Sequence, residues 1–160
     1  MTQEEFIKVL DKKRYSYEIE GDKIVVTHKG KLNLDSLTSI PPGVVFENRF
    51  EVFLRSLTSI PPGVVFNNKG NKGGFQFDNR APVYLDSLTS LHPGVEFNNE
   101  GHVILNYLTS ISPGVEFKNG GGVRLKSLKG DWFYKWESNL KGIESKRLLN
   151  VMIKQGVFER

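Results

Sequence analysis

The sequence predicts a mostly β protein: a repeat β-solenoid of about five 20-residue coils, with small α/β caps at both ends. Three observations favour this fold. One segment recurs almost verbatim, each copy contains alternating apolar and polar residues, and turn sequences separate the alternating stretches. A leucine-rich-repeat horseshoe is the second candidate fold.

The recurring segment is LTSIPPGVVF, which occupies residues 37–46 and returns with few changes at 57–66, 88–97 and 108–117. Successive copies are 20 residues apart, except that 31 residues separate the second from the third, so 11 residues are inserted near 67–77. The solenoid is predicted over 24–130. A helix/strand cap is predicted over 1–23 and a Trp-rich helical cap over 131–160.

Each copy contains two stretches whose apolar residues alternate, which is the period of a half-buried strand. One stretch reads Val-x-Phe and the other Val-x-Leu-x-x-Leu, with Pro-Pro-Gly and Asn-Asn-x-Gly turns between them. A 20-residue copy is too short for two strands and a useful helix, so it is expected to form a coil that pairs like strands with its neighbours. This stacking aligns four asparagines at one turn: Asn48, Asn68, Asn99 and Asn119.

The two flanks carry the signals of end caps, which a solenoid needs to cover its apolar ends. Thr2 and Glu5 match a capping box at the start of a helix. At the other end, Ser145 is expected to begin a helix whose apolar face contains Leu148, Leu149, Met152 and Ile153. The aromatic cluster before it, Trp132, Phe133 and Trp136, is interpreted as part of the cap, or alternatively as a partner-docking site.

The copy LTSIPPGVVFNN at 57–68 resembles the short leucine-rich-repeat-like proteins of tailed phages and gut bacteria. The resemblance covers roughly two thirds of the chain. It implies a repeat scaffold and a phage or mobile-element origin, and it implies no particular activity. The chain differs from ordinary leucine-rich repeats because no copy contains a Leu-x-x-Leu-x-Leu-x-x-Asn run.

The composition excludes several kinds of chemistry. The chain has no cysteine, which excludes disulfides, Cys-ligated zinc, iron–sulfur clusters and thiol nucleophiles, and which fits a cytoplasmic location. Neither a signal peptide nor a membrane-spanning stretch is evident. His28, His92 and His102 lack the spacing of metal ligands, and no nucleophile or phosphate-loop motif occurs. We therefore expect no catalytic residue, no metal and no cofactor, and we predict that the protein is not an enzyme.

Repetition fixes the core, so functional residues are expected where the repeat is broken. The first candidate is an outward stripe on the long strand, in which Phe53, Tyr84 and Ile104 are apolar. The stripe with its polar rim comprises Phe53, Arg55, Tyr84, Asp86, Ile104, Asn106 and Arg124. An apolar stripe with a polar rim is typical of a protein interface. The alternative is that a cap or loop covers it, or that it is plain strand surface.

The second candidate is the basic, glycine-rich insertion, where Lys69, Lys72 and Arg80 could bind an anion. The alternative is a long hairpin turn. The predicted function is a non-catalytic scaffold that binds another protein through a sheet face, as a phage-encoded protein that interferes with a host factor in the cytoplasm. Binding of a nucleotide or nucleic acid through the insertion is the second hypothesis. No membrane contact is expected, and the oligomeric state stays open.

Overall fold

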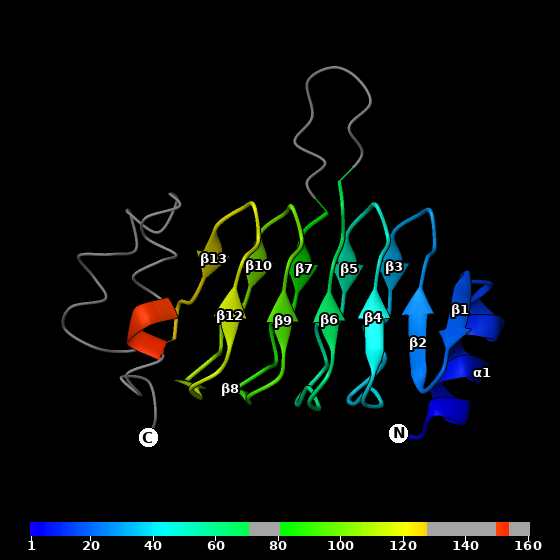
Figure 1. Ribbon diagram of the computed structural model, residues 1–160, viewed down its shortest axis with the longest axis horizontal. Coiled ribbons are helices and arrows are strands. Elements are labelled where there is room, and N and C mark those ends of the chain that lie inside the picture. The colour runs from blue at the N-terminus through cyan, green and yellow to red at the C-terminus, as the bar shows by residue number, and fades with distance from the viewer. Residues whose placement is uncertain (71–80, 128–149, 154–160) are drawn as a thin grey trace, which may run out of the picture.

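The computed structural model describes residues 1–70, 81–127 and 150–153. Short strands stack side by side along the long axis of the molecule and form a β-solenoid, with helix α1 (Gln3–Lys13) at the N-terminal end (Figure 1). The predicted solenoid is confirmed. The horseshoe alternative is wrong, because the described coils contain strands and turns where a horseshoe requires a helical back.

The strands form three sheets, one on each side of the coils. The six-stranded sheet has the order β1 (Tyr17–Glu20), β2 (Lys23–Val26), β4 (Val44–Phe46), β6 (Val65–Phe66), β9 (Glu96–Phe97) and β12 (Glu116–Phe117). The five-stranded sheet has the order β13 (Val123–Arg124), β10 (Val103–Ile104), β7 (Val83–Tyr84), β5 (Val52–Phe53) and β3 (Leu32–Asn33). The two-stranded sheet pairs β11 (Ser110–Ile111) with β8 (Ser90–Leu91).

All strand pairs are parallel except β1 with β2, because each coil runs in the same direction as the one before it. Paired residues are 20 positions apart in most pairs, as between Val45 and Val65. They are 31 positions apart from β6 to β9, where Val65 pairs with Glu96. The insertion therefore leaves the stacking intact, and the coil resumes at the buried residue Ala81.

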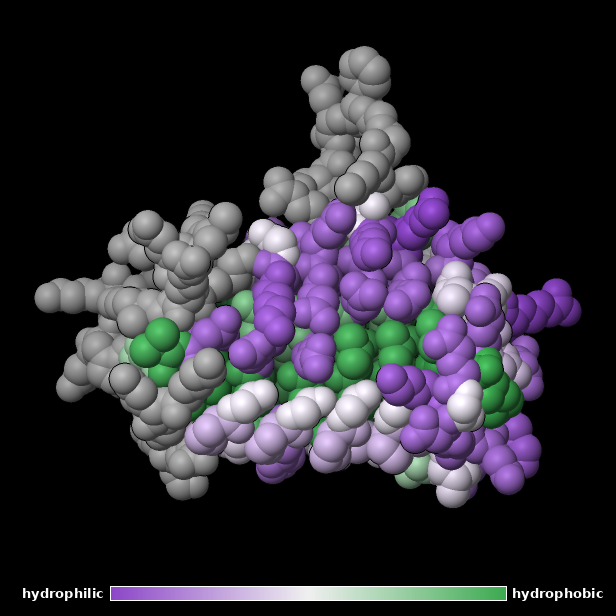
Figure 2. Space-filling model, in the orientation of Figure 1, coloured by the Kyte–Doolittle hydropathy of each residue, from purple (hydrophilic) through white to green (hydrophobic). Residues whose placement is uncertain are grey.

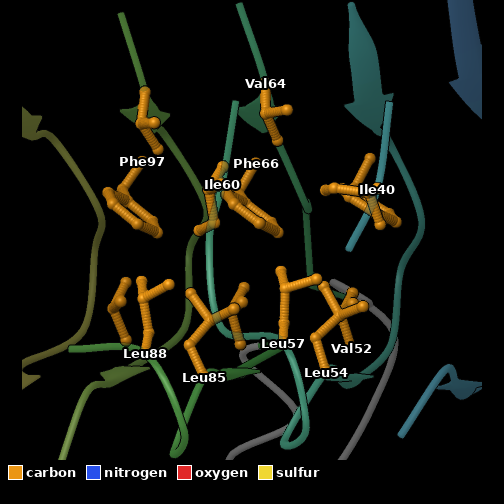
Figure 3. Close-up of a cluster of buried hydrophobic side chains, with 14 of the residues drawn as sticks. Ile40, Val52, Leu54, Leu57, Ile60, Val64, Phe66, Leu85, Leu88 and Phe97 are labelled. Carbon is orange, nitrogen blue, oxygen red and sulfur yellow. The ribbon is translucent and has the colours of Figure 1, made fainter. Parts of the chain in front are cut away.

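The alternation within each strand sends one set of side chains into a continuous core. Four phenylalanines of the six-stranded sheet stack in register, with ring centroids 5.0 to 5.2 Å apart: Phe46, Phe66, Phe97 and Phe117. Figure 3 shows Phe66 and Phe97 facing the leucines of the opposite side, including Leu54, Leu57, Leu85 and Leu88. These side chains are fully buried or nearly so, which makes their burial the main stabilising term of the fold.

The predicted asparagine ladder is present at one corner of the coils. Asn48, Asn68, Asn99 and Asn119 are at most 1% exposed. The Nδ2 group of Asn99 donates to the carbonyl of Gly101 two residues further on, at 3.0 Å, and that of Asn119 donates to Gly121 at 2.8 Å. The Asn119 amide also reaches the carbonyl of Gly101 in the coil below, at 3.2 Å. Such bonds hold the turns at Asn48, Asn99 and Asn119, and the bond from Asn119 to Gly101 joins two adjacent coils.

Each coil contains a Pro-Gly turn just before the strand of the six-stranded sheet. The glycines Gly43, Gly63, Gly94 and Gly114 have φ between 75° and 91°. This left-handed backbone is strained for residues with a Cβ atom, so the strict repetition of glycine here has a conformational reason.

Helix α1 closes the N-terminal end of the solenoid. Thr2 and Glu5 form the predicted capping box, and Phe6 and Leu10 are fully buried in the core. The Tyr15 hydroxyl accepts a hydrogen bond of 3.0 Å from the Asn33 N–H on the edge strand of the five-stranded sheet. The helix thus covers the apolar coil end, and one tyrosine satisfies part of the exposed edge.

At the C-terminal end, residues 150–153 are helical and lie against the last coil of the six-stranded sheet. The side-chain amide of Asn150 accepts from the Phe117 N–H at 3.0 Å and donates to the Phe117 carbonyl at 3.2 Å. Ile153 is fully buried and belongs to the core. Asn150 therefore pairs with the edge of β12 as a further strand would. The predicted cap residues Leu148 and Leu149 and the Trp-rich cluster lie outside the described residues.

Candidate functional site

The five-stranded sheet brings the predicted stripe together as one column on its outer face. The register pairs the column residues across successive strands in the order Asn33, Phe53, Tyr84, Ile104 and Arg124. We call these five residues the outer column. The leucines that follow its three middle members in the sequence, Leu54, Leu85 and Leu105, are fully buried. Since neighbouring residues of a strand point to opposite faces, the column faces away from the core.

Two aromatic rings form the centre of the outer column. The rings of Phe53 and Tyr84 stack with centroids 4.9 Å apart and planes 11° from parallel. The insertion lies between them in the sequence but does not separate them in space. Both side chains are half-buried, so part of each ring remains accessible to a partner.

Arg55 lies over both rings and is held there by a carboxylate. Its guanidinium carbon is 4.6 Å from the Phe53 ring centroid and 5.1 Å from that of Tyr84. Its Nη1 donates to Asp35 Oδ2 at 3.3 Å, and its backbone N–H donates to Asp35 Oδ1 at 2.8 Å. The cation–π contacts and the ion pair both favour this position of the guanidinium over the two rings.

The rest of the predicted rim lies in the row beside the outer column. Asn106 Nδ2 donates to Asp86 Oδ1 at 2.7 Å, which joins the corners of two coils. Arg124, at the C-terminal end of the column, is exposed. The rim of the five-stranded sheet is thus polar, and several of its side chains are hydrogen-bonded to one another. A polar rim is typical of the edge of a protein interface.

One part of the stripe prediction is wrong. Ile104 was expected to be an exposed apolar member, but it is only 8% exposed. Its register neighbours are Tyr84 and Arg124, two longer side chains on adjacent strands roughly 4.8 Å away. A shorter aliphatic side chain between two long ones presents little surface to water. The accessible apolar part of the column is therefore Phe53 and Tyr84.

A third aromatic residue near the outer column was missed from the sequence. Tyr107 is 62% exposed and follows Asn106 at the corner after β10. The equivalent residue of the other copies is serine, at Ser36, Ser56, Ser87 and Ser127. Comparing the copies position by position outside the strands would have revealed this break in the repeat. A large exposed aromatic at a serine position suits a binding surface.

The six-stranded sheet has an outward column of its own, formed by Val25, Val45 and Val65 in register. Figure 2 shows this side of the molecule, where a row of apolar side chains crosses the strands between polar borders. Val25 is buried, and Val45 and Val65 are half-buried. Beyond Val65 the register continues with Glu96 and Glu116, so this column has neither an aromatic ring nor a guanidinium in register, and its valines serve below as a control surface.

The structure describes the beginning of the insertion, up to residue 70. Lys69 is exposed, whereas Lys72 and Arg80 lie outside the described residues. Asn68, just before the insertion, is fully buried, but neither its amide nitrogen nor its oxygen forms a hydrogen bond. Its counterparts donate to the carbonyl two residues further on. The hydrogen bonds of the ladder are therefore interrupted at Asn68.

Each of the three histidines lies beside a residue of its own or a neighbouring coil or cap. The His28 ring lies 4.7 Å from that of Tyr15, His92 Nε2 is 3.4 Å from Ser90 Oγ, and His102 Nδ1 accepts from the Gly122 N–H at 2.8 Å. Within residues 1–70, 81–127 and 150–153, no group of three or more His, Asp or Glu side chains could hold a metal ion. In the same ranges, no helix has the length and apolar character needed to cross a membrane.

No family model, curated protein or solved structure matches this chain. A functional assignment therefore depends on the residues of the chain itself.

Proposed function

We propose that the protein is a non-catalytic repeat scaffold that binds another protein through the outer face of its five-stranded sheet. The observation that carries the proposal is the pair of stacked rings, Phe53 and Tyr84, beneath the guanidinium of Arg55. Aromatic residues and arginine are enriched at the centres of protein interfaces, where few residues supply most of the binding energy.

Several features of the surface support binding of a folded partner. The strands that present the rings are paired on both sides with strands of adjacent coils, which limits the backbone entropy lost when a partner docks. The rim beside the rings carries charges of both signs. Asp35 is paired with Arg55, and Asp86 lies in the same row on a later coil. Tyr107 adds an exposed aromatic side chain at the corner after β10. In this proposal the protein acts in the cytoplasm, and the partner is a host protein, as the resemblance to phage proteins implies.

The experiment that tests the proposal compares partner capture by the native chain and by the variant Phe53→Ser/Tyr84→Ser. Burial of a large apolar side chain contributes roughly 1.5–3 kcal/mol, so loss of both rings is expected to weaken binding by a factor of about 100 or more. The native chain, immobilised and exposed to host lysate, should retain a protein that the variant does not. Titration of that purified protein against both chains then gives the two dissociation constants.

The matched control is Val45→Ser/Val65→Ser, which removes apolar surface from the outer face of the other sheet. This variant is expected to bind the captured protein with the affinity of the native chain. Equal binding by the Phe53/Tyr84 variant, or loss of binding in the valine control alone, would place the interface elsewhere and contradict the proposal.

A further inference from the structure

Strand β1 is the edge of the six-stranded sheet, and one of its sides is unpaired. It pairs with β2 in an antiparallel register, from Tyr17 with Val26 to Glu20 with Lys23. No other strand in the described residues pairs with β1. An edge of this kind offers backbone groups to which a further strand can bind.

The hydrogen-bond pattern identifies which groups are free. The Thr27 N–H donates to the Ser16 carbonyl at 3.0 Å, so this pair is hydrogen-bonded. Antiparallel ladders alternate, which directs the backbone groups of Glu18 and Glu20 toward β2 and those of Tyr17 and Ile19 away from it. No hydrogen bond to another described residue involves the N–H or C=O of Tyr17 or Ile19.

The side chains of β1 differ on its two faces. Glu18 is in register with Val25 on the outer face of the sheet and is exposed, as is Glu20. Ile19 is in register with the core residue Ile24, but it lies beyond the end of the coil and is 62% exposed. The edge therefore combines an acidic outer face with an uncovered apolar side chain on the inner face.

One end of the strand is anchored. The Tyr17 hydroxyl donates to Asp11 Oδ1 of helix α1 at 3.0 Å. This hydrogen bond raises the pKa of the Tyr17 phenol above its ordinary value, and partial desolvation of the phenol and the negative charge of Asp11 act in the same direction. The bond ties the first residue of β1 to the helix, beside the free edge of the strand.

A second copy of the chain fits this edge poorly. Two-fold antiparallel pairing of β1 with itself, centred on Glu18, places Glu18 opposite Glu18 of the other copy. Centring on Ile19 places Glu18 opposite Glu20. Like charges directly opposite each other destabilise a strand pair. The acidic face therefore disfavours self-association and favours a basic strand.

We propose that β1 binds an extended peptide segment of a partner as an added strand, with lysine or arginine alternating with apolar residues. The backbone of the segment would pair with Tyr17 and Ile19, its basic side chains would lie opposite Glu18 and Glu20, and an apolar side chain would cover Ile19. This site is on the six-stranded sheet and does not depend on the binding face proposed above.

The test uses the full-length protein and a blocked, fluorescently labelled eight-residue peptide that alternates lysine with valine, in low-salt buffer. Binding is followed by fluorescence anisotropy, and amide hydrogen exchange is measured by NMR. The lysine peptide should bind and slow exchange of the Tyr17 and Ile19 amides. Glu18→Lys/Glu20→Lys should weaken binding about tenfold or more, since two opposite-charge pairs become like-charge pairs. Both glutamates are exposed, so the variant should retain the native circular dichroism spectrum.

Two control peptides separate strand addition from charge attraction. A glutamate–valine peptide should not bind, and a lysine–valine peptide with N-methylated alternate amides should lose binding although its charge is unchanged. Failure of the lysine peptide to bind would overturn the proposal and leave Glu18 and Glu20 as residues that merely block edge pairing. Equal binding of the methylated peptide, or a dimer through β1 in sedimentation measurements, would also overturn it.

Discussion

Replacement of Phe66 by alanine is expected to lower the free energy of unfolding by about 3–5 kcal/mol. Phe66 is fully buried and stacks on Phe46 at 5.1 Å and on Phe97 at 5.2 Å. Coils of a solenoid stabilise each other through nearest-neighbour contacts, so a cavity at the centre of this stack weakens two coil interfaces at once. Urea unfolding monitored by circular dichroism measures the loss as a lower midpoint.

The matched control for Phe66 is its neighbour in the same strand. Val65 points to the outer face and is half-buried, so Val65→Ala is expected to cost less than about 1 kcal/mol. Equal losses in the two variants would mean that the side chains of β6 are not divided between a buried and an outer face.

Removal of residues 132–160 is expected to expose the last coil and cause aggregation. The truncation removes Ile153 from the core and removes the Asn150 amide from the Phe117 backbone. It leaves an open strand edge beside an uncovered apolar coil end, which is the arrangement that favours edge-to-edge pairing. Size-exclusion chromatography with light scattering should show large species where the full chain gives one defined peak.

A point variant separates the two effects of the truncation. Asn150→Ala removes only the edge hydrogen bonds and is expected to cost about 1–3 kcal/mol while the chain remains folded. Val151→Ala, at a residue that is 46% exposed, should have little effect. A soluble, monomeric truncation with native stability would show that the C-terminal segment does not cover the last coil.

Much of the fold could be predicted because the repeat determines the register. A residue and its equivalent 20 positions later occupy the same place in successive coils, so apolar alternation in one copy specifies a buried column through all of them. This reasoning predicted the two alternating stretches of each coil, the asparagine ladder and the outward stripe. It did not reveal the two-stranded sheet, because Ser90–Leu91 and Ser110–Ile111 are too short to show a period.

The candidate site could be predicted as a column but not in its details. Register placed Phe53 beside Tyr84, whereas the position of Arg55 over both rings depends on a rotamer fixed by Asp35. The burial of Ile104 depends on the lengths of its neighbours, and strand alternation carries no such information. Tyr107 lies outside the alternating stretches, where strand alternation predicts nothing about exposure.

The two rings of the outer column form a surface separate from the core. The free energy of unfolding of Phe53→Ser/Tyr84→Ser, measured beside that of Leu54→Ala, tests this separation most directly. Leu54 is fully buried, so its truncation should cost about 2–5 kcal/mol. The double variant is predicted to cost clearly less, because both rings are half-exposed and lie outside the core. A double variant that is destabilised as much as Leu54→Ala would show that the rings are structural, and would contradict their assignment as a binding surface.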